Sequence, residues 1–299
     1  MTLIFENTPL SQSLDVSLGS SADLLQGAEG RQYRVYALNS AVDPVVKVQT
    51  SFVISPDYVR SAVIENLVID GQGLGVTGIL LQNVVKCQIR NVTIKNCEVG
   101  IHLRSQFGAW SECNFLKHIR MENVTKGILF TTTGPHPTDP KFPGDSAAFT
   151  VIDDVGISLA NRSDAVGIQI GGTHDTPNGP NDIPDVDSTL IKPYSARIKA
   201  NVWLGSNGGT GLKVCPNGEL KYAQAHLTVT GLSDGTGIHI EHDPQNSISK
   251  QDRVVWHNQF SEFDVSDDVT KKGFMLVTSG IDKPIIPSGV IADIEHKTF

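Results

Sequence analysis

The chain has 299 residues, of which 39% are hydrophobic and 19% charged, and it contains 28 glycines. This composition is typical of a β-rich protein with many turns and disfavours a fold built from amphipathic helices. The formal net charge of −8 would repel phosphate backbones, so we expect no general nucleic-acid binding. No apolar run reaches the length of a membrane span, so we expect no membrane insertion.

The first residues, Met-Thr-Leu-Ile-Phe-Glu, have neither the basic nor the apolar region of a secretory signal peptide. The chain as given is therefore not predicted to be a Sec precursor, although a mature product could begin this way. Four cysteines lack any Cys-x-x-Cys spacing, and we expect them to be small buried hydrophobes rather than disulfides. They are Cys87, Cys97, Cys113 and Cys215.

Residues 1–45 are predicted to form an N-terminal cap. Alternation at 14–18 and 33–37 indicates short strands, and 20–25 favours a helical turn. A repeat protein must cover its first open edge, because bare strand edges invite association. We expect residues 45–54 to hold the first strand-rich coil after this cap.

From residue 63 onward one unit is repeated. Asn-Leu-Val-Ile at 66–69 returns as Asn-Val-Thr-Ile at 91–94, and Gly-Ile-Leu-Leu at 78–81 returns as Gly-Ile-His-Leu at 100–103. The Gly–apolar–x–apolar strand recurs at Gly78, Gly100, Gly127, Gly167, Gly211, Gly237 and Gly273. Period-2 alternation places the two apolar residues in the core and the residue between them on the opposite face. A repeat of this length predicts a solenoid.

A second strand precedes each of these strands. Two residues after its last apolar position stands a residue that tolerates a left-handed backbone, as a sharp turn between strands requires. These residues are Gly71, Asn96, Asn123, Asn161, Gly231 and Asp267. A β-sandwich of unrelated strands is the alternative fold. It would have to account both for the repeated Gly–apolar–x–apolar strands and for this column of turn residues.

These columns resemble the right-handed parallel β-helix of the pectate lyase-like superfamily, which includes pectate and pectin lyases, polygalacturonases and tailed-phage spike proteins. The Asn96 and Asn123 pair is similar to the asparagine ladder of that fold. The resemblance covers about residues 45–280 and implies an all-β, single-stranded right-handed parallel β-helix (solenoid) of about seven to nine coils. We therefore predict a cap at 1–45, the β-helix at 46–280 and a closing segment at 281–299, where Pro284 and Pro287 hinder ladder pairing.

The outward residues of the repeated strands form one row in which polar and apolar members alternate. The row comprises Leu80, His102, Leu129, Gln169, Lys213, His239 and Met275. Such a row suits an amphipathic ligand such as a glycan, although a solvated sheet face is the alternative. Long segments follow these strands and would form a wall beside the row. The ligand-binding candidates are His102, Trp110, Gln169, Lys213, His239 and Glu241.

Residues 173–187 are rich in carboxylates, and calcium takes oxygen ligands from such clusters. The calcium candidates are Asp175, Asp182, Asp185 and Asp187. Their spacing matches no EF-hand loop, and the prolines between them favour an extended surface loop instead. We therefore assign no cofactor, and calcium is the one metal left open.

The superfamily resemblance also implies catalytic candidates. Polygalacturonases use an Asn-x-Asp, an Asp-Asp, a Gly-His-Gly and an Arg-Ile-Lys in this order. Three similar segments occur here and supply Asp153, Asp154, His174 and Arg197. The upstream Asn-x-Asp is absent and the histidine triplet lacks its last glycine, so the pair of carboxylates that inversion by water attack requires is incomplete.

Three functions fit these observations. The first is a virion spike, fibre or decoration protein of a tailed virus, a homotrimer that binds host surface glycans through the loop-walled face. The second is a polysaccharide lyase or polygalacturonase-like hydrolase acting on an extended glycan in the same groove. The third is a cell-surface adhesin. We expect a virion-surface location for the first, and an extracellular or cell-surface location otherwise.

Overall fold

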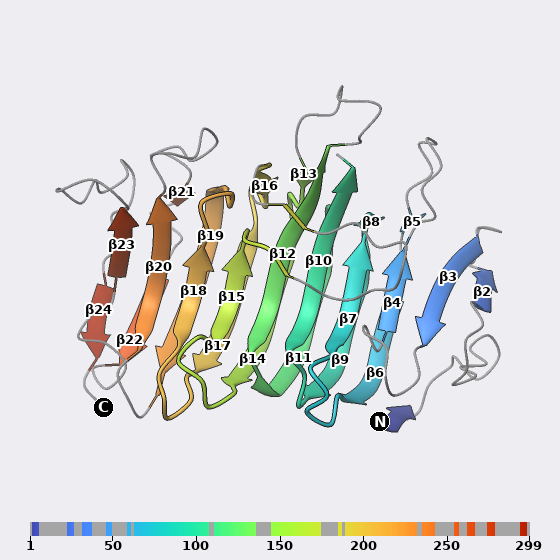
Figure 1. Cartoon of the computed structure of the whole chain (residues 1–299), viewed down its shortest axis with the longest axis horizontal. Coiled ribbons are helices and arrows are strands. Elements are labelled where there is room, and N and C mark those ends of the chain that lie inside the picture. The colour runs from blue at the N-terminus through green and yellow to red at the C-terminus, as the bar shows by residue number, and fades with distance from the viewer. Residues whose placement is uncertain are drawn as a thin grey trace.

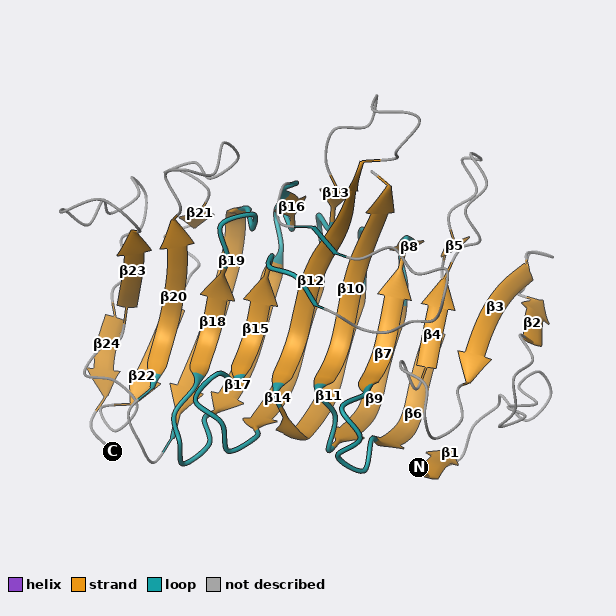
Figure 2. Cartoon of the chain, viewed as in Figure 1, coloured by secondary structure: helices purple, strands orange, loops and turns teal. Residues whose placement is uncertain are grey.

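The computed structural model describes residues 63–107, 111–135, 145–174, 185–186, 189–231 and 235–242, and nine short strands outside these ranges. All regular secondary structure in the described residues is β-strand (Figure 2). Among these residues no helix is long and apolar enough to cross a membrane.

Most strands belong to two large sheets, which form two layers along the long axis of the molecule (Figure 1). Sheet A contains, in spatial order, β1 (Thr2–Phe5), β6 (Val63–Asp70), β9 (Gln88–Lys95), β11 (Phe115–Val124), β14 (Val151–Leu159), β17 (Arg197–Trp203), β19 (Leu220–Thr230), β22 (Glu262–Ser266) and β24 (Ile294–Lys297), with β21 (Val254–Trp256) paired to β19. Sheet B contains β2 (Asp23–Gln26), β3 (Gln32–Ala37), β4 (Val46–Gln49), β7 (Thr77–Gln82), β10 (Val99–Phe107), β12 (Lys126–Pro135), β15 (Val166–Ile170), β18 (Thr210–Val214), β20 (Thr236–His242) and β23 (Phe274–Thr278). Two small sheets pair β5 (Val59–Arg60) with β8 (Val84–Val85) and β13 (Asp145–Ser146) with β16 (Ile191–Lys192).

The chain alternates between the two sheets, so equivalent strands of successive repeats become parallel neighbours. Antiparallel pairing occurs at the N-terminal edge, where β1 pairs with β6 and β3 pairs with both β2 and β4. The helical turn predicted at 20–25 is not observed, because Asp23–Gln26 forms strand β2. After the prolines of the predicted closing segment, β24 adds one more parallel strand beside β22.

The prediction of a single-stranded right-handed parallel β-helix is wrong. In the described part of the chain the strands form two separate parallel sheets, and no solenoid is found there. The physical reason is that a repeated strand specifies which strands pair, but not how the paired strands are distributed among sheets. Two layers that pack face to face bury the same apolar columns.

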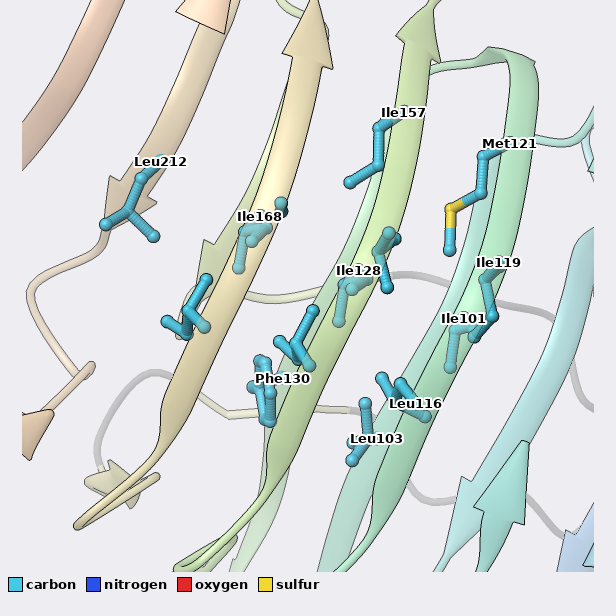
Figure 3. Packing of buried hydrophobic residues seen from close by; sticks show 14 of the residues in the cluster. Ile101, Leu103, Leu116, Ile119, Met121, Ile128, Phe130, Ile157, Ile168 and Leu212 are labelled. Atoms are coloured by element: carbon cyan, nitrogen blue, oxygen red, sulfur yellow. The ribbon is translucent and has the colours of Figure 1, made fainter. Parts of the chain in front are cut away.

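The core lies between the two sheets. The inward column of sheet B runs in register through Ile79, Ile101, Ile128, Ile168, Leu212 and Ile238, each at most 1% exposed. Figure 3 shows side chains of this column directed into the same space as Leu116, Ile119 and Met121 of sheet A. The predicted alternation of inward and outward residues is thus confirmed here. Each fully buried Ile or Leu contributes about 1.5–3 kcal/mol.

None of the four cysteines forms a disulfide, and three of them, Cys87, Cys97 and Cys215, are buried. Burial raises the pKa of Cys87 and of Cys215 to about 12, so both remain protonated thiols at neutral pH. The prediction of small buried hydrophobes holds for these three.

The asparagine pair expected at the turns is present. The side-chain amide of Asn123 donates to Asn96 Oδ1 at 2.9 Å, and that of Asn96 donates to Asp70 Oδ1 at 2.9 Å. Both asparagines have a left-handed backbone, with φ of 53° and 55°. Gly71 and Asn161, predicted for the same role, are not among the residues with positive φ.

Gly127 illustrates why glycine recurs at the start of the sheet B strands. A Cβ at this position would lie 2.5 Å from the carbonyl oxygen of Gly167 and 2.8 Å from Ile157 Cγ2. The neighbouring strands β12 and β15 therefore lie too close together for any side chain at position 127.

We expect Gly127→Ala to lower the free energy of unfolding by about 2–3 kcal/mol, because neither the carbonyl nor the core side chain can move freely. Urea denaturation would measure this change. Gly156→Ala is the control, since its Cβ would first meet the flexible Arg120 side chain at 3.1 Å. Equal losses in both variants would contradict the packing explanation.

Candidate functional site

The outward row predicted on sheet B is present, but half of it is buried. His102 lies in register with Leu80 of β7 and Leu129 of β12, and the row continues through Gln169, Lys213 and His239. The members from Leu80 to Gln169 are at most 6% exposed, although Leu80 and Leu129 lie outside the core cluster between the sheets. Other residues therefore cover this part of the outward face.

The cover includes residues from the segment that follows β15. The His174 ring contacts the His102 ring edge to face, with 5.6 Å between centroids. The backbone amide of Val186 donates to the carbonyl oxygen of Thr132 on β12 at 2.8 Å. The described ends of this segment are thus held against β10 and β12.

A buried charge cluster fixes this contact, and it consists of His102, Arg104, Thr131, His174 and Asp185. Arg104 Nε donates to Asp185 Oδ1 at 2.7 Å, and both side chains are at most 1% exposed. The second carboxylate oxygen, Oδ2, accepts the backbone amide of His174 at 3.2 Å. Asp185 therefore joins a strand residue, Arg104, to the segment that covers the strand.

Both histidines of the buried charge cluster are neutral at neutral pH. Burial, together with the positive charge of Arg104, lowers the pKa of His102 well below its usual value. Burial, with Lys126 and Arg104 nearby, lowers the pKa of His174 to about 4. The 4.0 Å approach of His102 Nε2 to Asp185 is consequently not an ion pair at neutral pH.

The hydrogen bonds of Thr131 determine the tautomer of His102. Thr131 Oγ1 lies 2.6 Å from His102 Nε2, and its hydroxyl also bonds the carboxylate of Asp185. Because that carboxylate can only accept, Thr131 donates to Asp185 and must accept from His102. His102 therefore carries its proton on Nε2.

The calcium candidates divide between described and undescribed residues. Asp185 is engaged by Arg104, and burial raises the pKa of its carboxyl despite this partner. Asp175, Asp182 and Asp187 lie outside the described residues. Within the described part of the chain, no group of three or more His, Cys, Asp or Glu side chains could hold a metal ion.

Beyond Gln169 the outward face is partly open, and we name Lys213, His239 and Glu241 the open triad. Lys213 Nζ lies 2.9 Å from Glu241 Oε1, and these side chains are 26% and 28% exposed. His239 Nε2 lies 3.9 Å from the same oxygen, and burial lowers the pKa of His239. The open triad thus combines a cation, a carboxylate and a neutral imidazole on the neighbouring strands β18 and β20.

The four catalytic candidates do not form one site. Asp153 and Asp154 lie on the outward face of β14 in sheet A, where they approach Lys117 Nζ at 3.6 Å and Arg120 Nη2 at 3.3 Å respectively. Arg197 begins β17 of the same sheet, whereas His174 covers sheet B. The core between the sheets separates His174 from the other three.

Two residues differ from the predicted site: one candidate is not described, and one member of the buried charge cluster was not predicted. Trp110, a ligand-binding candidate, lies outside the described residues. Arg104 was not predicted, although it occupies the next outward position after His102 on β10. Period-2 alternation places Arg104 on this face, but no local pattern predicts a partner 81 residues away.

Comparisons with protein-family models, with curated protein sequences and with solved structures find no match for this chain. The resemblance to the pectate lyase-like superfamily therefore stays a prediction.

Proposed function

We propose that this protein binds glycans through the open triad of sheet B, as a virion spike, fibre or decoration protein. The observation that carries the proposal is the partly exposed Lys213–Glu241 pair with His239 beside it. Sugar hydroxyls both donate and accept hydrogen bonds. Lys213 can donate to them and Glu241 can accept from them, while the partly exposed His239 ring lies beside this pair.

The covering segment is also tied to the chain just after β18, which supports this proposal. The Gly172 amide donates to Asn217 Oδ1 at 2.6 Å, and the Asn217 side-chain amide donates to the carbonyl oxygen of Val186 at 3.0 Å, so covering residues are held near the strand of Lys213. A binding site whose groups are already in place loses less entropy on binding.

We expect Lys213→Gln and Glu241→Gln each to weaken glycan binding about tenfold, because each removes one charged hydrogen-bonding group. A glycan array would identify ligands, and calorimetry would measure the dissociation constants. Lys95→Gln is the matched control, since Lys95 and Glu122 form an exposed pair at 2.9 Å on sheet A. Unchanged affinity in both triad variants would reject the proposal.

The proposed binding requires no metal. Added EDTA should leave the affinity unchanged, because the open triad recognises the sugar through its own side chains. A loss of binding in EDTA that calcium restores would instead assign a role to the carboxylates of residues 175–187.

A polysaccharide lyase or glycoside hydrolase is the second candidate. In its favour, the buried charge cluster brings two histidines with lowered pKa values beside a carboxylate, and such perturbed groups are frequent in active sites. Assays for new reducing ends and unsaturated sugars would test it. If polysaccharide degradation is lost in His174→Gln and kept in Asp154→Asn, this result would favour the enzyme.

Association into a homotrimer and a location on the virion surface belong to the same proposal. Light scattering of the purified chain tests the first, and detection of the chain in purified virions tests the second. A monomer at micromolar concentration would remove the homotrimer from the proposal without affecting the open triad.

A further inference from the structure

Sheet A carries a second polar surface on the opposite side of the molecule from the open triad. Strand register aligns two outward rows across β9, β11, β14, β17 and β19, flanking the buried residues Ile89, Leu116, Ile152, Ile198 and Ala225. The first row is Gln88, Phe115, Val151, Arg197 and Gln224. The second row comprises Arg90, Lys117 and Asp153 and, beyond a register shift in β14, Lys199 and His226. We name this surface the basic face.

Two of the four cations on the basic face, Arg197 and Lys199, have no counter-charge among the described side chains, although the whole chain carries a net charge of −8. Arg90 pairs with Glu65, and Lys117 lies 3.6 Å from Asp153. Arg197 and Lys199 are both exposed, and no ion pair to either is found among the described side chains. They lie on the same face of β17, about 6.6 Å apart along the strand. Their mutual repulsion would be relieved by an anionic ligand.

Exposed aromatic rings border the same face. Phe115 is 47% exposed, and Phe149 and Tyr222 are each 56% exposed. Backbone hydrogen bonds place Phe149, Ser195 and Tyr222 at equivalent positions of neighbouring repeats. Phe149 and Tyr222 are therefore two strand spacings apart, about 9.6 Å.

The backbone at Phe149 and Tyr222 is unfavourable for aromatic residues. Both have a φ of 56°, in the left-handed region where bulky side chains are rare. Neither ring is buried enough for core packing to explain its presence. Strained residues of this kind that lie on a surface point to a role in binding.

We infer that the basic face binds an acidic polysaccharide, whose sugar units carry carboxylate or sulfate groups. Aromatic rings stack on the apolar faces of sugar rings, and the separation of Phe149 and Tyr222 is comparable with the length of two sugar units. Arg197 lies in the adjacent row and can pair with an acid group of a sugar held between the two rings. Lys199 can pair with the next acid group.

Charge spacing favours a polysaccharide over a nucleic acid. A single nucleic-acid strand carries one charge per 3.4 Å, which requires a dense row of cations. Here Asp153 lies in register with Lys117, so a carboxylate follows this cation, and a register shift in β14 separates it from Lys199. A polyuronate carries one carboxylate per sugar unit, a wider charge spacing that matches cations separated by one or two strands.

The test is calorimetry of the full chain with polygalacturonate, heparin, neutral dextran and single-stranded DNA, at low and at physiological salt. We expect one or both acidic polysaccharides to bind, more weakly as salt rises, and dextran not to bind this face. Arg197→Gln/Lys199→Gln should weaken that binding at least about tenfold. The charge-matched control, Lys95→Gln/Arg162→Gln, should keep it.

A further variant separates binding from folding. Phe149→Asn suits the left-handed backbone, so we expect a raised melting temperature together with weaker polysaccharide binding. Wild-type affinity in Arg197→Gln/Lys199→Gln, or binding of DNA without either acidic polysaccharide, would overturn the inference.

Discussion

Asp185→Asn is expected to lower the free energy of unfolding by about 3–5 kcal/mol, because Arg104 would stay buried without a counter-charge. Asparagine has nearly the volume of aspartate and keeps one oxygen to accept a hydrogen bond. The loss would therefore report the charge rather than a cavity. Urea denaturation followed by circular dichroism measures it directly.

A double-mutant cycle makes this prediction sharper. Arg104→Met should also destabilise the fold, since it leaves the buried Asp185 carboxyl without its cationic partner. Arg104→Met/Asp185→Leu should recover most of the loss, because an apolar pair needs no desolvation of charge. If the double mutant lost the sum of the two single-mutant losses in free energy of unfolding, a buried ion pair would not be the cause.

The exposed pair of Arg162 and Asp164 is the matched control. Its Nη2–Oδ2 distance is 2.8 Å, but the two side chains are 50% and 64% exposed. Solvent screens such pairs, so Asp164→Asn should cost less than about 1 kcal/mol. A similar cost at both sites would mean that burial is not what makes Asp185 important.

The repeat of the sequence predicted strand pairing and the inward columns well. Ile101 and Ile128 pair as expected because strands with the same inward residues bury each other most completely when aligned. The number of sheets was not predictable in this way. It depends on how the chain crosses from one layer to the other, which no alternation pattern encodes.

The candidate site was only partly predictable, for a different reason. The positions of His102 and Lys213 in the outward row follow from alternation alone. The burial of His102 depends on residues that come more than seventy positions later and have no periodicity of their own. Phe149 escaped prediction too, because aromatic residues rarely take the left-handed backbone that it has here.

Acidification is expected to destabilise the protein through His174, in the range from pH 6.5 down to about 4. The unfolded chain binds a proton at its ordinary pKa of 6.5, whereas the folded chain resists it until about 4. The unfolded state therefore holds more protons throughout this range, and folding stability falls as pH falls. His174 alone accounts for a loss of about 2–3 kcal/mol.

Two neighbours modify this loss in opposite directions. His102, whose pKa is also lowered by burial, adds a loss of the same sign. Asp185 has a raised pKa, so its folded state binds a proton more readily than the unfolded chain does. Its contribution to stability grows as pH falls through that raised pKa toward 3.8, and it offsets part of the histidine loss at the acid end.

Urea denaturation at a series of pH values between 7 and 4 would separate these effects. In His174→Gln the slope of the free energy of unfolding against pH should be shallower by up to about 1.4 kcal/mol per pH unit. This is the slope that a difference of one bound proton produces. His118→Gln is the control, because that side chain is 53% exposed on sheet A. An unchanged slope in His174→Gln would mean that His174 is accessible to protons in the folded protein. The segment that covers sheet B would then not be held as tightly as the Asp185 contacts indicate.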